Sequence, residues 1–416
     1  MNSSTEQSGY ARRLIPMLGR DPHERGRVAS PLELLYDLTF VVAIGVASEQ
    51  LAEMVAAGHP GRGFVGFGFA MFAILLAWIN FSWFASAFDT DDWLYRLLTM
   101  VQMVGVVVFS LGIAPMFHSI EEGHHVDITL MVAGYVVMRI ALVAQWARVA
   151  RQSPQFHTVA LRNIWWISIC QLGWVALAVL DLDLVGTFTW IVVLGLVEFA
   201  VPVFAQGRAS GTPWHPHHIA ERYSLFAIIA LGEGVVGTVA SSRGALGGVT
   251  GDDWSAAAVL VLVAGVGMTF SMWWTYFLLP FGDLLHSRPG RGYVFGYGHL
   301  PVFAAIAATG AGLHVAGLYL ESSAAGEHGE HHLAVTPLGV VVMVAAALAV
   351  FYVALVLLVK GLGSPVGSVW IILGTLAVLA LAVLVGARSM PIGLIVAMLG
   401  SFVPVLGHEI ADRLHT

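Results

Sequence analysis

Charged side chains are scarce in this chain of 416 residues: Asp, Glu, Lys and Arg together make up 11% of it, and Lys360 is its one lysine. A soluble globular protein carries roughly 25% charged residues, which water solvates at its surface. One very large soluble core is excluded too, because cores stop growing near about 250–300 residues and still need a polar shell. The net charge of −7 leaves no basic face for nucleic acid. The composition therefore indicates a membrane protein whose first partner is the lipid bilayer.

Cysteine is almost absent as well. The single cysteine, Cys170, excludes an intramolecular disulfide and a thiolate metal site. No phosphate loop, dinucleotide-binding fingerprint or G-x-S-x-G motif occurs in a suitable context, and the segment from His217 to Glu221 lacks the second histidine of a zinc-protease helix. We therefore expect no cofactor, and the sequence favours a protein that is not an enzyme.

Apolar sequence, in contrast, is abundant: 58% of the residues are hydrophobic and the mean hydropathy is +0.81. Between Pro337 and Gly407 the only charged residues are Lys360 and Arg388, and the pieces between them are long enough for helices that cross a hydrocarbon core of ~30 Å. The runs do not alternate apolar with polar residues, which excludes a transmembrane barrel. We predict an all-α polytopic bundle of about twelve transmembrane helices, at 31–57, 63–87, 93–117, 126–150, 159–181, 184–206, 217–240, 254–279, 293–319, 335–359, 365–386 and 390–410.

This count predicts the orientation of the chain. With the amino terminus inside, fourteen Lys and Arg residues fall on cytoplasmic segments, three fall outside, and two lie within spans. Residues 1–30 then form a cytoplasmic segment, 31–206 a first half of six helices and 207–416 a second half, with both termini in the cytoplasm. Two halves in the same orientation predict a parallel repeat, as in some transporters. Two features recur at matching places in the two halves. Each half begins a helix at a proline, Pro31 or Pro216, and each contains a loop rich in His and acids, at 118–127 or 321–332.

Ionisable residues inside predicted spans are costly and therefore mark functional candidates. Glu33 and Asp37 lie on one face of the first helix, spaced by four residues. For Glu33 the alternative is helix-start chemistry, because Ser30 to Glu33 has the spacing of a capping box, with Pro31 at the first helical position. Asp37 lies one turn deeper, so we expect it to function directly or in an ion pair.

The segment from His217 to Glu233 carries the largest polar stripe. His218, Arg222 and Glu233 share one face of this helix, and Glu221 lies on the adjacent face. Gly232 and Gly234 beside Glu233 predict close approach by another helix or a local break. The structural alternative is a set of buried ion pairs, with Arg222 bound to Asp37 or Glu198 and Arg139 bound to Glu233.

Three further groups complete the candidates. His299 suits a proton relay, although a lone helical histidine is more often a hydrogen-bonded packing residue. Asp89, Asp92 and Arg96 form a polar cluster that is alternatively a solvated helix cap with Asp92 and Arg96 as an ion pair. The two His/acid loops have ligand types suited to a divalent cation but no spacing of a closed site, so metal binding is left open.

Several motifs resemble the bacterial low temperature requirement protein A family: the run from Pro31 to Ala43, Phe88-Asp-Thr-Asp-Asp92 followed by Tyr95-Arg96, the run from Glu221 to Glu233, and Trp273-Trp-Thr-Tyr-Phe277. The resemblance covers the chain to about residue 390. Members of that family tend to have an acid directly after the last motif, where this chain has Leu278. The resemblance implies a multi-pass protein of the bacterial inner membrane.

Three functions follow from these residues. The first is a transporter or ion- or proton-coupled permease for a small solute or ion, in which Asp37 or Glu233 takes up a proton or cation and Arg222 tunes it. The second is an intramembrane metal-dependent enzyme that uses His217, His218 and Glu221. The third is a non-catalytic membrane sensor or scaffold whose buried charges hold its helices together.

Overall fold

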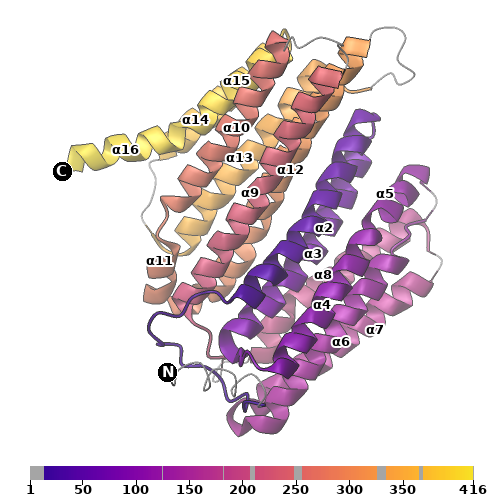
Figure 1. Ribbon diagram of the computed structural model, residues 1–416, viewed down its shortest axis with the longest axis vertical. Coiled ribbons are helices and arrows are strands. Elements are labelled where there is room, and N and C mark those ends of the chain that lie inside the picture. The colour runs from indigo at the N-terminus through magenta and orange to yellow at the C-terminus, as the bar shows by residue number, and fades with distance from the viewer. Residues whose placement is uncertain are drawn as a thin grey trace, which may run out of the picture. The chain divides into compact units, whose positions relative to one another are not determined.

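The computed structural model describes residues 14–123, 125–180, 182–206, 211–247, 255–325, 334–364 and 369–415. This part of the chain is helical and contains no strand, as the sequence predicts (Figure 1). Its first helices are α2 (Pro31–Ala56), α3 (Pro60–Phe88), α4 (Trp93–Leu111), α5 (Ile113–Glu122), α6 (Thr129–Gln152), the short η1 (Pro154–Phe156), α7 (His157–Val179), α8 (Leu184–Gln206) and α9 (Pro216–Gly247). The remaining ones are α10 (Ala256–Phe277), α11 (Phe281–Ser287), η2 (Pro289–Arg291), α12 (Gly292–Ala325), α13 (Pro337–Gly361), α14 (Val369–Gly386), α15 (Met390–Ser401) and α16 (Val403–His415).

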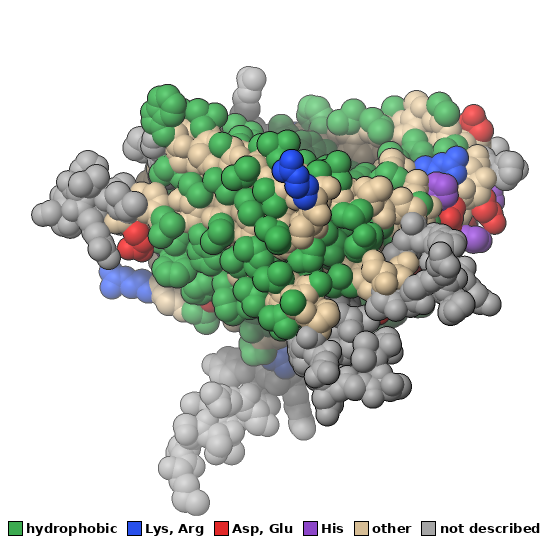
Figure 2. All heavy atoms as spheres, turned by 90° about the horizontal axis from the view of Figure 1, so that it is seen from above, with side chains coloured by type: hydrophobic (Ala, Val, Ile, Leu, Met, Phe, Trp, Pro, Cys, Tyr) green, Lys and Arg blue, Asp and Glu red, His purple; other side chains and the backbone are tan. Residues whose placement is uncertain are grey.

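Eleven segments of the described chain are long and apolar enough to cross a membrane, where the sequence predicts twelve. The difference is the predicted span 159–181. It forms α7, which has 23 residues but carries Arg162, Asn163 and Gln171 and is absent from the eleven apolar spans. Large apolar side chains point outward on many helices; Val185 is 72% exposed and Trp370 77%. Figure 2 shows a face on which hydrophobic side chains predominate and charged ones are few. The outward-pointing apolar side chains fit a surface that contacts lipid rather than water.

Local sequence explains where the helices end. Gly363 has a φ of 80°, and its N–H and that of Ser364 donate to the carbonyls of Lys360 and Val359, which closes α13 in a left-handed turn. After Gly386, Pro391 stands in the first turn of α15. Both helix ends fall where the predicted spans 335–359, 365–386 and 390–410 separate.

Contacts divide the chain into two compact units that cut across helices: residues 1–46 with 72–223, and residues 47–71 with 224–416. Each unit therefore combines parts of both sequence halves, and the division at residue 206, the parallel repeat and the cytoplasmic termini stay predictions. In the first unit α4 packs on α6, α6 on α7 and α7 on α8 (Figure 1). Its core includes a cluster of rings from Phe84, Phe88, Trp146 and Phe156.

The second unit is built on α10, α12, α13, α14 and α15, with α12 against α13 and α14 against α15 (Figure 1). Its centre contains hydroxyl groups that bond to one another. Ser271 on α10 donates to Ser401 on α15, and the Tyr352 hydroxyl on α13 donates to the Ser401 carbonyl at 2.8 Å. These bonds join three helices in the interior of the unit.

Candidate functional site

The start of α2 is the predicted capping box, and it does more than cap the helix. Ser30 N donates to Glu33 Oε2 at 2.8 Å, while Glu33 N donates to Ser30 Oγ at 3.3 Å. These reciprocal bonds satisfy two backbone donors that the first helical turn leaves free. Glu33 is nevertheless buried, with 1% of the residue exposed. A buried carboxylate is costly unless it is paired, so the position of Glu33 indicates a second contact.

That second contact is with Arg222 on α9, which is fully buried and binds both acids of the first helix. Its Nη1 donates to Glu33 Oε1 at 2.8 Å, and its Nε donates to Asp37 Oδ2 at 3.1 Å, with a further bond from Nη2 to Asp37 Oδ1. Trp78 Nε1 on α3 donates to the same Asp37 oxygen at 2.7 Å, and Ser82 lies 3.4 Å from Arg222 Nη2. The predicted pair of Arg222 with Asp37 is confirmed, and Glu33 joins it.

His218 lies one turn before Arg222 and is also fully buried. Its Nε2 is 3.3 Å from Glu33 Oε2, and its Nδ1 is 3.2 Å from Ser86 Oγ on α3. Its backbone N–H donates to Nδ1 of His215, which precedes the helix. Burial lowers the pKa of His215, so its neutral ring accepts this bond and acts as the cap of α9.

Glu33, Asp37, Arg222 and His218 together form what we call the Arg222 cluster. Within it, two carboxylates share one guanidinium, so the cluster carries one excess negative charge unless it holds a proton. His218 is the titratable side chain in contact with that excess charge. Arg27 interacts electrostatically with Glu33, but its Nη1 and Nη2 donate to the carbonyls of Ser86 and Ala85 at the end of α3.

Glu221, the fourth candidate on α9, stands apart from the cluster. It is half-buried, and its Oε2 accepts a bond of 3.3 Å from the backbone N–H of Ala29. Partial burial makes the charge of Glu221 more costly, and this backbone contact offsets part of that cost. Glu221 therefore ties the segment before α2 to α9.

A second buried arginine forms a different arrangement. Arg139 on α6 donates from Nη2 to Glu198 Oε1 on α8 at 2.8 Å, and Trp174 Nε1 on α7 donates to the other Glu198 oxygen at 3.0 Å. The Tyr135 hydroxyl donates to Glu198 and its ring lies under the guanidinium. The predicted pairing of Arg139 with Glu233 is therefore wrong: a helix nearer in sequence supplies the partner. This pair has one charge of each sign and is neutral as a whole.

In the loop between α3 and α4, a second predicted ion pair is wrong. Asp92 caps α4 by accepting from Tyr95 N at 2.9 Å, as predicted, but its ion pair is with Arg148 on α6, whose Nη1 donates at 2.9 Å. Arg96 instead binds Asp91, at 2.7 Å from Nη2 to Oδ2. The cap is not solvated either, because Asp92 is 1% exposed. Burial opposes its ionisation, but the bonds from Arg148 and the backbone outweigh burial and lower the pKa of Asp92 to about 2.

Asp89 has the opposite electrostatic environment. Burial, and after it the negative charge of Glu33, raises the pKa of the Asp89 carboxyl to about 6. The Asp91 N–H, at 2.8 Å, and Arg20, at 3.6 Å, counteract this only in part. Asp89 thus lies within electrostatic reach of the Arg222 cluster and titrates close to neutral pH.

Glu233 lies in the second unit, half-buried on α9, and forms no hydrogen bond or ion pair within the described residues. Its charged neighbour is Glu49 on α2. The predicted close approach is confirmed at Gly234, where a Cβ would lie 2.6 Å from Thr269 Oγ1, but is wrong at Gly232, where a Cβ would meet no atom within 4 Å. A Cβ at Gly310 on α12 would lie 2.8 Å from the Glu233 carbonyl oxygen. The alternative, a local break, does not occur, because α9 continues to Gly247.

His299 on α12 is enclosed in the second unit by rings of Tyr276, Phe281, Phe295 and Phe303. Its Nδ1 lies 2.7 Å from the Phe295 carbonyl, so this nitrogen is the donor, and its Nε2 accepts from the Tyr276 hydroxyl at 3.0 Å. These bonds match the packing alternative for His299.

The His/acid loops contribute no metal site to the described chain, where no three His, Cys, Asp or Glu side chains gather as ligands. The first predicted loop, 118–127, begins inside α5, where His118 pairs with Glu122 at 3.3 Å and both side chains are exposed. His124 and residues 326–333, which include most of the second loop, lie outside the described residues.

The sequence did not lead us to the residues of α3 that hydrogen-bond the Arg222 cluster. Trp78, Ser82 and Ser86 are fully buried and hydrogen-bond Asp37, Arg222 and His218, respectively. Two signals were available: a buried Trp N–H needs an acceptor, and these three residues recur every four positions on one face of α3. Arg148 was missed because its acid lies on a different helix.

Comparison with known proteins agrees with these motifs. The family model described as bacterial low temperature requirement A protein matches residues 28–403. An uncharacterized protein of Rhizobium meliloti (strain 1021) is 27% identical over 299 residues, which cover 68% of this chain and 68% of that protein. No solved structure matches the chain.

Proposed function

The chain belongs to the bacterial low temperature requirement A protein family, and on that premise we propose that it is a proton-coupled transporter of a small solute or ion in the bacterial inner membrane. Its many membrane-capable helices make it a multi-pass membrane protein. The proposal assigns proton coupling to the Arg222 cluster. A membrane-embedded carboxylate that exchanges a proton is a common device of pumps and transporters.

The observation that carries the proposal is the unequal charge count of the cluster. Two carboxylates, Glu33 and Asp37, bind the single guanidinium of Arg222 in a place that excludes water. An uncompensated charge in a buried site is costly, so a group in such a site shifts its protonation to become neutral. One proton on the cluster balances it. The neutral pair of Arg139 and Glu198 has no need of a proton and supplies the internal comparison.

The contact between His218 and Glu33 is where we place that proton. Asp37 is held by two guanidinium bonds and by Trp78, whereas Glu33 Oε2 faces the imidazole at 3.3 Å. Loss of the proton leaves an excess negative charge in a dry site. That state favours a conformation in which Glu33 or His218 reaches water, and the return of the proton favours the closed cluster. Coupling follows if solute binding also depends on which conformation is present.

Glu233 is the second acid in the proposal. It is half-buried, without a basic partner in the described chain, and beside the crossing of α9 with α12. An acid in this setting suits transient contact with a cation or with a basic group of a solute. We assign it to the solute path rather than to the proton.

The test is proton movement driven by solutes in proteoliposomes. The purified protein is reconstituted with a pH-sensitive dye inside, and amino acids, sugars, nucleosides, organic acids and inorganic ions are added in turn. We expect one class to drive proton entry, and Asp37→Asn and Glu33→Gln to abolish it. Asp91→Asn, which removes an exposed acid and suits the positive φ of 49°, is the matched control and should transport normally.

Two results would refute the coupling role: no class of solute moves protons with the wild-type protein, or the cluster variants move them at the rate of the Asp91→Asn control. If Glu233→Gln alone abolished proton entry while both cluster variants retained it, the proton site would belong to Glu233 instead.

The complete burial of Asp37 and Arg222 also favours the sensor or scaffold, in which the cluster only fastens α2 to α9. In that case each substitution should lower thermal stability in proportion to any loss of function. The coupling role predicts instead that Glu33→Gln stops proton movement in a protein that remains stably folded.

A further inference from the structure

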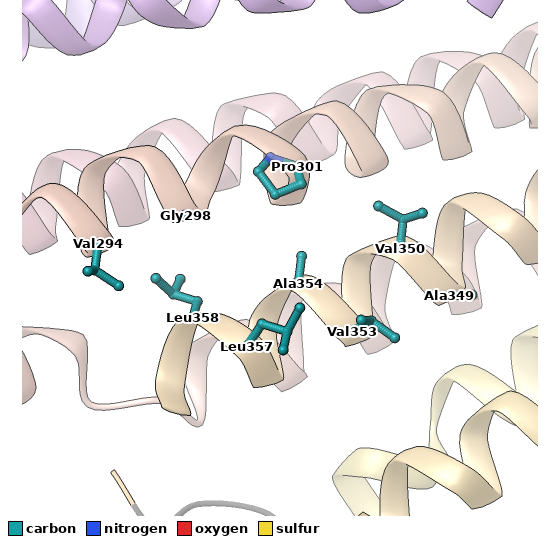
Figure 3. Close-up of a pocket in the computed structure, with 9 residues that line it drawn as sticks. All are labelled: Val294, Gly298, Pro301, Ala349, Val350, Val353, Ala354, Leu357 and Leu358. Carbon is teal, nitrogen blue, oxygen red and sulfur yellow. The ribbon is translucent and has the colours of Figure 1, made fainter. Parts of the chain in front are cut away.

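A groove runs along the surface of the second unit between α12 and α13 (Figure 3). Its nine lining residues are Gly, Pro, Ala, Val or Leu, and its volume is about 480 Å³. On α12 the lining consists of Val294, Gly298 and Pro301, and Leu358 of α13 packs beside Gly298, where a Cβ would lie 2.7 Å from Leu358 Cδ1. On α13 the lining extends from Ala349 to Leu358. The outer rim is open, since Val350 is 49% and Leu357 63% exposed.

The length of the groove matches one leaflet of a bilayer. From Ala349 to Leu358 a helix rises about 14 Å, which is close to half of a hydrocarbon core of about 30 Å. Helix α13 runs from Pro337 to Gly361, so the groove occupies its carboxy-terminal half and ends near Lys360. An acyl chain entering from that membrane face would run along the groove and stop near the bilayer midplane.

Basic residues gather at that end. Lys360 is exposed and follows Leu358 by two positions; Arg291 is exposed and precedes Val294 by three. The two helix ends touch there, because a Cβ at Gly361 would lie 2.8 Å from Val294 Cγ1. A third base, Arg288, donates to the Leu362 carbonyl at 2.6 Å at the end of α13. The neighbouring stretch 281–294 contributes one acid, Asp283, so the surroundings of this end are basic overall.

We propose that this groove binds an anionic glycerophospholipid, with one acyl chain between α12 and α13 and the phosphate at Lys360 and Arg291. An all-aliphatic lining recognises the chain but cannot distinguish lipid headgroups. Basic side chains at a membrane surface supply that selectivity, at a strength of about fivefold in affinity for each Lys or Arg. The proposal concerns only the second unit and does not depend on the transport function.

Native mass spectrometry of the intact protein tests the site. Detergent-purified protein receives an equimolar mixture of dioleoylphosphatidylglycerol and dioleoylphosphatidylcholine, which differ in charge but not in acyl chains. We expect the wild-type protein to retain the phosphatidylglycerol in excess. Lys360→Gln and Arg291→Gln should each reduce this excess by about fivefold. Val350→Trp, at the open rim, should reduce retention of both lipids.

Arg388→Gln is the matched control, because Arg388 is an exposed base of the same unit that follows α14 and does not line the groove. Equal retention of the two lipids by the wild-type protein would overturn the proposal, and so would a loss of selectivity in Arg388→Gln as large as in the groove variants. Displacement of the lipid by soluble glycerol phosphate would show a free phosphate site instead. A dimer that Val350→Trp abolishes would identify a second copy of the chain as the occupant. The comparison within the wild-type protein stands even where a variant does not fold.

Discussion

The guanidinium of Arg222 and the carboxylate of Asp37 face each other through two parallel hydrogen bonds, Nε to Oδ2 at 3.1 Å and Nη2 to Oδ1. This bidentate geometry is the strongest form of an ion pair. The third nitrogen of the Arg222 guanidinium, Nη1, donates to Glu33. Arg222 therefore balances Asp37 fully and Glu33 only by sharing, whereas Arg139 binds a single acid, Glu198, among the described residues.

This asymmetry predicts different costs for removing one acid. Glu33→Gln should lower the free energy of unfolding by less than about 1.5 kcal/mol, because Gln also serves in a capping box and the Arg222–Asp37 pair stays balanced. Glu198→Gln should cost about 3–5 kcal/mol, since it leaves the buried Arg139 without a counter-charge. Thermal unfolding in detergent, followed for both variants, measures the difference. Equal losses would show that the Arg222 cluster carries no excess negative charge.

Asp89 predicts a pH-dependent stability. Because burial raises its pKa to about 6 in the folded protein, the folded state binds the Asp89 proton more tightly than the unfolded state does. Its contribution is complete below about pH 4 and is lost as the pH rises through about 6, by up to about 3 kcal/mol. Melting temperatures measured between pH 4 and 7 should therefore depend less on pH in Asp89→Asn than in the wild-type protein.

Asp92 is the control for that experiment, since the pKa of its carboxyl is lowered to about 2 despite its burial. Its stabilisation is present above about pH 4 and is lost as the pH falls toward 2, outside the window tested. Asp92→Asn should lower stability at every pH from 4 to 7 without changing the slope of melting temperature against pH. If Asp89→Asn left the slope of melting temperature against pH unchanged, the pH-dependent stability would not come from Asp89.

Where α9 crosses α12, we predict that a single added methyl group destabilises the protein. A Cβ at Gly237 would lie 2.3 Å from the Gly310 carbonyl oxygen, a backbone atom that cannot move away by itself. Gly237→Ala should destabilise the second unit by about 1–3 kcal/mol, because the helices must separate. Gly232→Ala, on the same helix with no atom within 4 Å of its Cβ, should unfold at or above the wild-type temperature. Similar melting temperatures for the two variants would show that the helices do not meet at Gly237.

Cys170 offers a probe of the first unit. It is the only cysteine of the chain and is 1% exposed on α7. We expect N-ethylmaleimide to react with it only after this unit opens, so the labelling rate in detergent should rise steeply at the unfolding temperature. Mass spectrometry of the labelled protein gives that rate. Fast labelling of the folded protein would place the thiol at the surface.

The amino-acid sequence by itself determined the membrane class, the helical architecture and most helix limits. These features depend on the length of apolar runs and on neighbouring residues: the Ser30–Glu33 capping box, the Asp92 cap and the Gly/Pro breaks around residues 363 and 391 all act within a few positions. Lipid also forces each spanning segment to satisfy its backbone internally, which leaves the helix as its structure.

The tertiary structure alone decided which buried charges meet. Arg139 binds Glu198 rather than Glu233, and Arg148 rather than Arg96 binds Asp92, because pairing depends on how separate helices are rotated and placed against one another. One helix face shows which residues point the same way, but not which helix lies opposite. Only the packing of α2, α3 and α9 brought two acids, one arginine and one histidine into the same buried place.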